Sequence, residues 1–160
     1  MDTLDLKILA SLDADTRRPF ADLARELEVS QPTIADRVRR LESRGVVRGT
    51  MLCVDYARLG FTINAFVRLR STPSHRNGLV EAARDIPQII EMHQLTGEDC
   101  MIARVVARSV DELGAILERL AAFAQPNTSV VLSTPIPLRN PIPAHKSSGT
   151  PLLRAPESRP

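Results

Sequence analysis

The sequence predicts an α+β protein with two parts, and three observations lead to this prediction. Apolar residues recur every three or four positions over the first part of the chain, which indicates amphipathic helices. From Phe61 onward the apolar residues alternate instead, which indicates strands. The elements expected there follow the order strand-helix-strand-strand-helix-strand, which is the order of a ferredoxin-like sandwich with two helices on one face of an antiparallel sheet.

Three helices are expected before residue 50. The apolar face of the first consists of Leu4, Ile8, Leu9 and Leu12. The second repeats this pattern over 20–27, after Pro19, which can begin a helix but not lie within one. The third begins after Ser30, a good N-cap, and ends at Gly45. The stretch RGTMLCVDY that follows is expected to form a strand or the wing of a winged helix-turn-helix.

Four strands and two helices are expected in the second part. INAFVRLR, IIEMHQLT and CMIARVVA are three strands, the last two joined by a turn at GED, and SVVLS at 129–133 is the fourth. One helix is expected over 75–85, and the other behind the capping-box sequence SVDE at 109–112. The expected organisation is a winged helix-turn-helix at 1–50, a connecting strand or hinge at 51–60, the ferredoxin-like unit at 61–138, and a proline-rich disordered tail at 139–160.

Composition argues against several classes of protein. A net charge of +2 excludes a global polycation that clings to nucleic acid. Cys53 and Cys100 form no CxxC pair, and the three histidines are scattered, so no metal site is expected and the thiols indicate a reducing cytoplasm. The chain also lacks an apolar run of membrane-spanning length and a signal-peptide pattern, so we expect a cytoplasmic protein without membrane contact.

The third helix is expected to carry an arginine-rich outer face. Turning Ile34 and Val38 toward the core directs Asp36, Arg39 and Arg40 outward, with Arg37 on the flank. Arginine can bind guanine or phosphate in this position, and an amide at the helix start can bind adenine. The predicted DNA-binding residues are Ser30, Gln31, Pro32, Thr33, Asp36, Arg37, Arg39, Arg40 and Arg48. The alternative is the solvated face of an ordinary three-helix domain.

Glu28 lies in the turn between the second and third helices. Many helix-turn-helix proteins have glycine at this position, because the backbone there is left-handed. A left-handed glutamate costs about 1 kcal/mol, so this turn is expected to differ slightly.

The first part of the chain resembles the amino-terminal winged helix of the leucine-responsive/AsnC (Lrp/AsnC) transcription regulators. The family pattern L-A, L-S-x-x-T-V-x-x-R-I-x-R-L-E-x-x-G-V-I is matched in register by Leu23-Ala24, Val29-Ser30, Thr33-Ile34, Arg37-Val38, Arg40-Leu41-Glu42 and Gly45-Val46-Val47. The second part resembles the effector-binding domain of this family, so the resemblance covers about residues 1–138. It implies a sequence-specific, DNA-binding transcriptional regulator controlled by a small metabolite.

The resemblance also implies an effector pocket between protomers, commonly for an amino acid, beside the turn in LTGEDCMIARV. Gly97 matches the family, whereas Glu98-Asp99-Cys100 departs from its common Gly-x-Tyr-Asp pattern. Turn amides can bind a carboxylate, and acidic side chains can bind an ammonium group. The predicted effector-binding residues are Gly97, Glu98, Asp99, Cys100, Thr128 and Ser129, with no other cofactor and no catalytic residue.

The strand CMIARVVA is apolar on both faces, so a second copy of the chain is expected to cover the sheet face that the helices leave free. A two-fold dimer would bind a pseudo-palindromic operator on double-stranded DNA, and the resemblance implies further assembly, often to octamers. Two other classes remain open. One is an enzyme similar to the sirohaem decarboxylases, which look similar in fold, and the other is an interaction module that no longer binds DNA.

Overall fold

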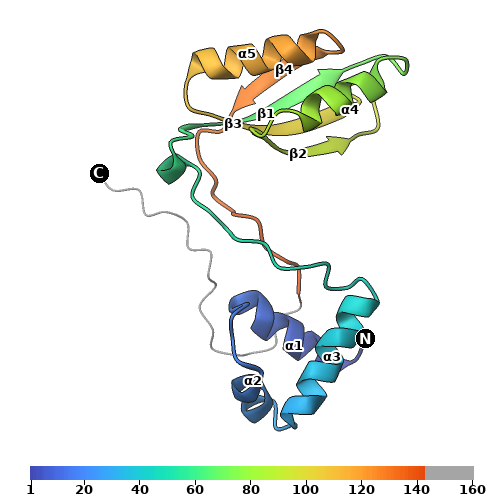
Figure 1. Ribbon diagram of the computed structural model, residues 1–160, viewed down its shortest axis with the longest axis vertical. Helices are drawn as coiled ribbons and strands as arrows, with labels where there is room; N and C mark the ends of the chain where they lie inside the picture. Colours follow the sequence, from blue (N-terminus) through green and yellow to red (C-terminus); the bar gives the residue numbers. More distant parts are fainter. Residues whose placement is uncertain (143–160) are drawn as a thin grey trace. The chain divides into compact units, whose positions relative to one another are not determined.

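A computed structural model describes residues 1–142, which form two compact units (Figure 1). One unit consists of Met1–Leu52 and the described residues from Thr134 onward, and the other of Cys53–Ser133. The first unit contains three helices, and the second contains an antiparallel sheet with two helices. Most of the predicted disordered tail, residues 143–160, lies outside the described residues.

The helical unit consists of α1 (Thr3–Ala14), α2 (Phe20–Glu26) and α3 (Gln31–Ser43). Its core is a cluster of buried side chains from all three helices, namely Ile8, Leu23, Ala24, Ile34 and Val38. The helix ends follow the predicted capping signals. Ser30 is the N-cap of α3, and its Oγ accepts a hydrogen bond of 3.2 Å from the backbone N–H of Thr33. Gly45 follows the helix with a φ of 69°.

The turn between α2 and α3 keeps the left-handed backbone of a helix-turn-helix despite its glutamate. Glu28 has a φ of 55°, and among the described residues it is the one non-glycine residue with a positive φ. Such a conformation costs an L-residue about 1–2 kcal/mol. The buried side chains on either side of the turn, Leu23 and Ile34, hold this geometry against that cost.

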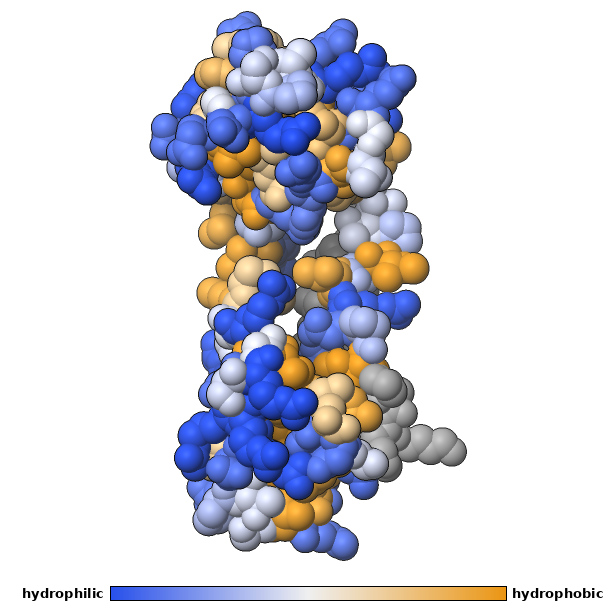
Figure 2. All heavy atoms as spheres, turned by 90° about the vertical axis from the view of Figure 1, so that its right-hand side faces the viewer, coloured by the Kyte–Doolittle hydropathy of each residue, from blue (hydrophilic) through white to orange (hydrophobic). Residues whose placement is uncertain are grey.

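The prediction of a strand over RGTMLCVDY is wrong. The described backbone between α3 and β1 contains only a short 3-10 helix, η1 (Ala57–Leu59). A strand must pair its backbone N–H and C=O groups with a neighbour, and no described segment of this chain pairs with residues 48–56. The apolar residues that favoured a strand are exposed instead, Met51 by 76% and Leu52 by 73%. Figure 2 shows apolar side chains gathered on the segments that connect the two units.

The sheet unit follows the predicted order of elements. These are β1 (Ile63–Arg70), α4 (Arg76–Arg84), β2 (Ile89–Gln94), β3 (Met101–Ala107), α5 (Val110–Ala121) and β4 (Gln125–Val130). The strands pair in the order β2-β3-β1-β4, and every neighbouring pair is antiparallel. The ferredoxin-like arrangement is therefore confirmed, with both helices on one face of the sheet (Figure 1).

Alternation along the central strands divides their side chains between two faces. The face toward the helices contributes Val67 and Leu69 from β1, and Ala103 and Val105 from β3, to a core that also contains α4 and α5 residues. The other face, here called the free face, carries Asn64, Phe66, Arg68 and Arg70 from β1 and Ile102, Arg104 and Val106 from β3. Phe66 is 40% exposed there, so the described residues leave part of this face uncovered.

The last strand begins earlier than predicted. β4 spans Gln125–Val130 rather than 129–133, because it pairs along β1 from Arg70 to Ala65. The prediction followed the apolar residues of SVVLS, but the pairing with β1 determines where this strand begins and ends. Pro126 lies within it and is tolerated because β4 is an edge strand. Within residues 1–142, no helix has the length and apolar character needed to cross a membrane.

Candidate DNA-binding face and effector site

The outer face of α3 brings together most of the predicted DNA-binding residues. Ile34, Val38 and Leu41 are buried, which turns the opposite side of the helix to solvent. Exposed on that side are Gln31, Pro32, Asp36, Arg39 and Arg40. Ser30 and Thr33 lie at the start of the same helix, where their hydroxyl oxygens are 2.8 Å apart and hydrogen-bond each other. The face therefore presents two unburied guanidinium groups beside a rigid helix start.

Arg37 does not share this outward direction. Its Nη1 donates a hydrogen bond of 3.0 Å to Oδ1 of Asp5, and it also donates to Oδ2 of Asp2. Both acids lie at the start of α1, so this guanidinium points toward α1 and not outward into solvent. The interpretation of Arg37 as a DNA contact missed these partners. The capping-box spacing of Asp2 and Asp5 locates these acids at the start of α1, but nothing in the sequence connects them with Arg37.

Arg48 is exposed in the segment after α3, where no strand is formed. Arg48 lies beyond the end of α3, as predicted, but the wing that was expected to contain it is absent from the described backbone.

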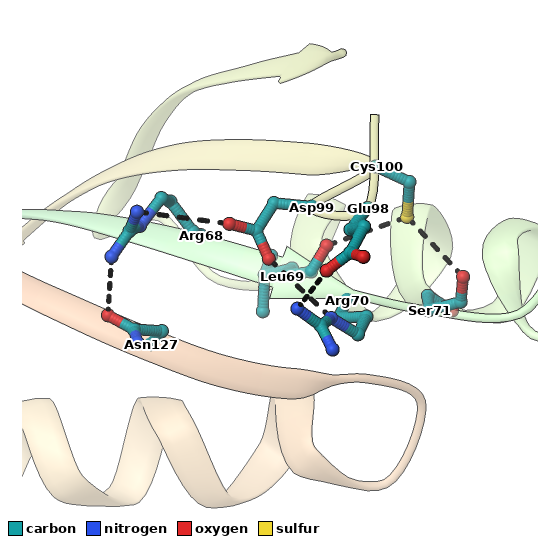
Figure 3. Close-up of polar contacts among 8 residues, drawn as sticks. All are labelled: Arg68, Leu69, Arg70, Ser71, Glu98, Asp99, Cys100 and Asn127. Atoms are coloured by element: carbon teal, nitrogen blue, oxygen red, sulfur yellow. Dashed lines mark hydrogen bonds and ion pairs between the residues drawn. The ribbon is translucent and has the colours of Figure 1, made fainter. Parts of the chain in front are cut away.

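A cluster of charged side chains surrounds the predicted effector turn, and Figure 3 shows how they lie. The turn closes with a hydrogen bond of 2.8 Å from the N–H of Leu95 to the carbonyl oxygen of Cys100. Arg70 on β1 donates to Glu98 at 2.8 Å, and its Nε lies 3.8 Å from Asp99. Arg68 lies 3.9 Å from Asp99 and donates to Asn127 on β4 at 3.0 Å (Figure 3).

The charged cluster contains both signs and remains open to solvent. The side chains of Arg68 and Arg70 are 48% and 55% exposed, and that of Glu98 is 83% exposed. Exposed ion pairs of this kind contribute about 0–1 kcal/mol each, so a ligand can replace them at little cost. Sequence reasoning missed the two arginines and Asn127. The alternation in INAFVRLR puts both arginines on the same strand face, but their position beside the turn and beside Asn127 depends on strand pairing.

Cys100 belongs to the core rather than to the solvent side of the turn. Its side chain is buried, and its Sγ lies 3.5 Å from the carbonyl oxygens of Leu69 and Ser71 (Figure 3). The sulfhydryl is thus a weak donor to the backbone at the end of β1 and just after it.

The two predicted hydroxyls on β4 lie on opposite sheet faces. Thr128 pairs with Val67, on the side of the helices, whereas Ser129 pairs with Phe66, on the free face. The Oγ1 of Thr128 is buried and has no hydrogen-bond partner among the described residues. Only Ser129 shares a face with Arg68 and Arg70. Across residues 1–142 no three histidine, cysteine or acidic side chains come together as metal ligands would.

A helix-turn-helix unit joined to an antiparallel sheet unit with a polar turn defines a class of two-part DNA-binding regulators. An AsnC-type helix-turn-helix domain matches residues 1–42, and an Lrp/AsnC ligand binding domain matches residues 64–141. The chain belongs to the Lrp/AsnC family of transcriptional regulators.

Similar proteins occur in archaea and bacteria. The chain is 31% identical to the transcriptional regulator Ptr1 of Methanocaldococcus jannaschii over 117 residues, which are 73% of this chain and 79% of that protein. It is 32% identical to the uncharacterized regulator YezC of Bacillus subtilis over 134 residues, 84% of this chain and 95% of that one.

Solved structures share the complete two-unit fold. AsnC of Escherichia coli has a TM-score of 0.81 at 26% identity, covering 89% of this chain and 99% of that one. The feast or famine regulatory protein of Mycobacterium tuberculosis, solved in complex with L-methionine, has a TM-score of 0.82 at 28% identity with the same coverage, 89% and 99%.

Proposed function

We propose that this regulator reads a specific DNA sequence with the outer face of α3, and that a small zwitterion controls its binding. The observation that carries this proposal is the pair of exposed arginines on that face, Arg39 and Arg40, which form no ion pair among the described residues. Guanidinium groups that are not neutralised by the protein are available for guanine O6 and N7 or for phosphates. The DNA-binding part corresponds to residues 1–50, the hinge to 51–60 and the effector-binding part to 61–138.

The other residues of the face have supporting roles in this proposal. Gln31 reaches an adenine edge from the helix start, while Ser30, Pro32 and Thr33 bring that start close to the duplex. Asp36 accepts from cytosine N4 or orients a neighbouring arginine, because a carboxylate repels phosphate. Arg48 binds phosphate from beyond the end of the helix.

A second copy of this chain covers the free face of the sheet. Phe66 and Ile102 supply apolar surface there, and the polar residues Asn64 and Arg104 on the same face hydrogen-bond each other at 3.3 Å. A two-fold pairing of such faces is self-complementary and gives two reading helices per dimer. The operator is therefore pseudo-palindromic, and dimers assemble further, to octamers.

The effector is a free amino acid or a similar zwitterion at the charged turn. Glu98 and Asp99 supply carboxylates for its ammonium group, and Arg68, Arg70 and the amides near Gly97 supply donors for its carboxylate. Arg68, Asn127 and Ser129 lie on the free face, so a ligand here also touches the proposed dimer interface. That position explains how binding would change assembly or operator affinity, by about 1–3 kcal/mol of coupling. The bound L-methionine of the mycobacterial structure supports this ligand class.

The proposal assigns no catalytic step to the chain. A tetrapyrrole-binding enzyme of this fold needs cationic groups around a large anion, whereas His93 lies 2.7 Å from the carboxylate of Glu91. We infer that the regulator acts in the cytoplasm, where its operator is accessible.

Selection from a random DNA pool tests the DNA-binding role. The wild-type protein should enrich a sequence with two inverted half-sites whose centres lie about 10 base pairs, or a multiple of that spacing, apart. The Arg39→Ala/Arg40→Ala variant should lose this enrichment while keeping its circular dichroism spectrum. Absence of any enriched sequence with the wild-type protein would contradict the proposal and favour an interaction module.

Calorimetric titration with each of the twenty amino acids tests the effector. A binder should lose affinity on Glu98→Gln/Asp99→Asn and on Arg68→Gln, but not on the control Glu118→Gln, which changes an exposed acid of α5. A binder that is indifferent to the turn and strand variants would place the effector elsewhere.

A further inference from the structure

An ion-pair cluster connects the beginning of α1 with the middle of α3. The carboxylates of Asp2 and Asp5 cap α1 reciprocally, because each accepts the backbone N–H of the other, at 2.9 Å and 3.0 Å. Arg37 donates to both carboxylates at once. One guanidinium group on the recognition helix is thus held by two acids that lie 32 and 35 residues away in the sequence.

This cluster is more protected than an ordinary surface ion pair. The side chain of Asp5 is 9% exposed and that of Arg37 is 26% exposed. A buried carboxylate needs a partner of opposite charge, and Arg37 is that partner. The arginine holds the pKa of Asp2 below its ordinary value, and the capping N–H of Asp2 together with Arg37 does the same for Asp5.

The cluster also supplies a directional contact that the apolar core lacks. Ile34 and Val38 attach α3 to the other helices by apolar packing, which is not directional. Hydrogen bonds from Arg37, by contrast, tolerate only small changes of distance and angle. Side-chain atoms lie about 5–6 Å from a helix axis, so turning α3 by about 10° moves its outer atoms by about 1 Å. A shift of this size is enough to break a bidentate contact with a base.

We propose that Arg37 is a positioning residue, which, through Asp2 and Asp5, fixes the rotation of α3 so that Arg39 and Arg40 meet the DNA in the correct register. This inference rests on the proposed DNA-binding function and deepens it. Arg37 itself touches neither base nor phosphate. Asp2 and Asp5, at the start of α1, become necessary for recognition of the DNA sequence because they hold Arg37 in place.

The most informative variant is Asp2→Asn in the full-length chain. Asparagine is as good an N-cap as aspartate, so α1 keeps its cap, while Arg37 loses the charge of one partner. Removing an acid from a DNA-binding unit should by itself strengthen binding to phosphates. Positioning predicts the opposite, a loss of about tenfold or more in operator affinity with unchanged affinity for random DNA. The matched control is Glu42→Gln, which removes an exposed acid from α3 and should leave operator affinity equal or higher.

Salt dependence separates positioning by Arg37 from a direct phosphate contact. Arg37→Gln should lower operator affinity without changing the slope of log affinity against log salt, whereas a lost phosphate contact would reduce that slope by about 0.9 per protomer. The double variant Asp2→Asn/Arg37→Gln should be no worse than Arg37→Gln alone, because both changes break one contact. If Arg37→Gln fails to fold, the Asp2→Asn comparison still decides the question.

The possible failures are distinguishable. An Asp2→Asn chain that prefers the operator as strongly as the wild type would overturn the positioning role and leave the proposed function standing. A reduced salt slope for Arg37→Gln would also overturn the positioning role, because it would show that Arg37 contacts phosphate, and it would leave the proposed function standing. A wild-type chain that prefers no DNA sequence would contradict the proposed function together with this inference.

Discussion

Gly78 on α4 offers a sharp test of how the helices pack on the sheet. A Cβ at this position would lie 2.7 Å from Cε1 and 2.9 Å from Cδ1 of Phe123. The Phe123 ring would have to move by several tenths of an ångström, and overpacking of this kind costs about 1–3 kcal/mol. Replacing a helical glycine by alanine also stabilises the helix by about 1 kcal/mol, which offsets part of this cost. Gly78→Ala should therefore destabilise the sheet unit by about 0–2 kcal/mol.

Gly114 on α5 is the matched control, because a Cβ there meets no atom within 4 Å. Gly114→Ala should stabilise the same unit by about 1 kcal/mol, through helix propensity alone. The two variants should thus differ by about 1–3 kcal/mol. Native-state hydrogen exchange of the β1 and β3 amides, read by mass spectrometry, measures this difference without interference from the helical unit. Equal stabilisation by the two alanines would refute the close contact between Gly78 and Phe123.

Three further predictions concern the helical unit. Glu28→Gly should raise its free energy of unfolding by about 0.5–1 kcal/mol, measured by thermal denaturation, because glycine adopts the left-handed turn without strain. Ser30→Ala should lower it by about 1 kcal/mol in the same assay, through loss of the α3 cap. The lowered pKa values of Asp2 and Asp5 mean that their stabilisation is complete above the unfolded pKa and is lost as the pH falls through the folded pKa, below about 4. Helix melting at pH 7 and pH 3 should show this loss in the wild type and a smaller loss in Asp2→Asn, where only Asp5 still titrates.

Local signals predicted most of the fold. Period and capping residues located the three helices, with Ser30 and Gly45 at the ends of α3. Alternation located β1 and β3 and separated their two faces correctly. These features depend on residues that are close together in the chain, so they can be predicted from a single sequence.

Features that depend on distant partners could not be predicted. The stretch after α3 has the composition of a strand but no described segment to pair with, so its apolar residues remain exposed. β4 was placed too late because its register depends on β1 and not on its own apolar residues. The partners of Arg37 were missed because Asp2 and Asp5 lie 35 and 32 residues away from it in the sequence. The charges around Glu98 and Asp99 likewise come from another strand.

Operator binding by the Arg39→Ala/Arg40→Ala variant tests the central claim most directly, with Arg119→Ala, an exposed arginine of α5, as the control. Fluorescence anisotropy on the selected operator, repeated over a range of salt concentrations, gives both affinity and salt slope. We predict a loss of about 100-fold or more in affinity for the double variant, with a smaller salt slope if either arginine binds phosphate, and no change beyond about threefold for the control. A folded double variant that binds the operator as tightly as the wild type, at every salt concentration, would show that the outer face of α3 does not read the DNA.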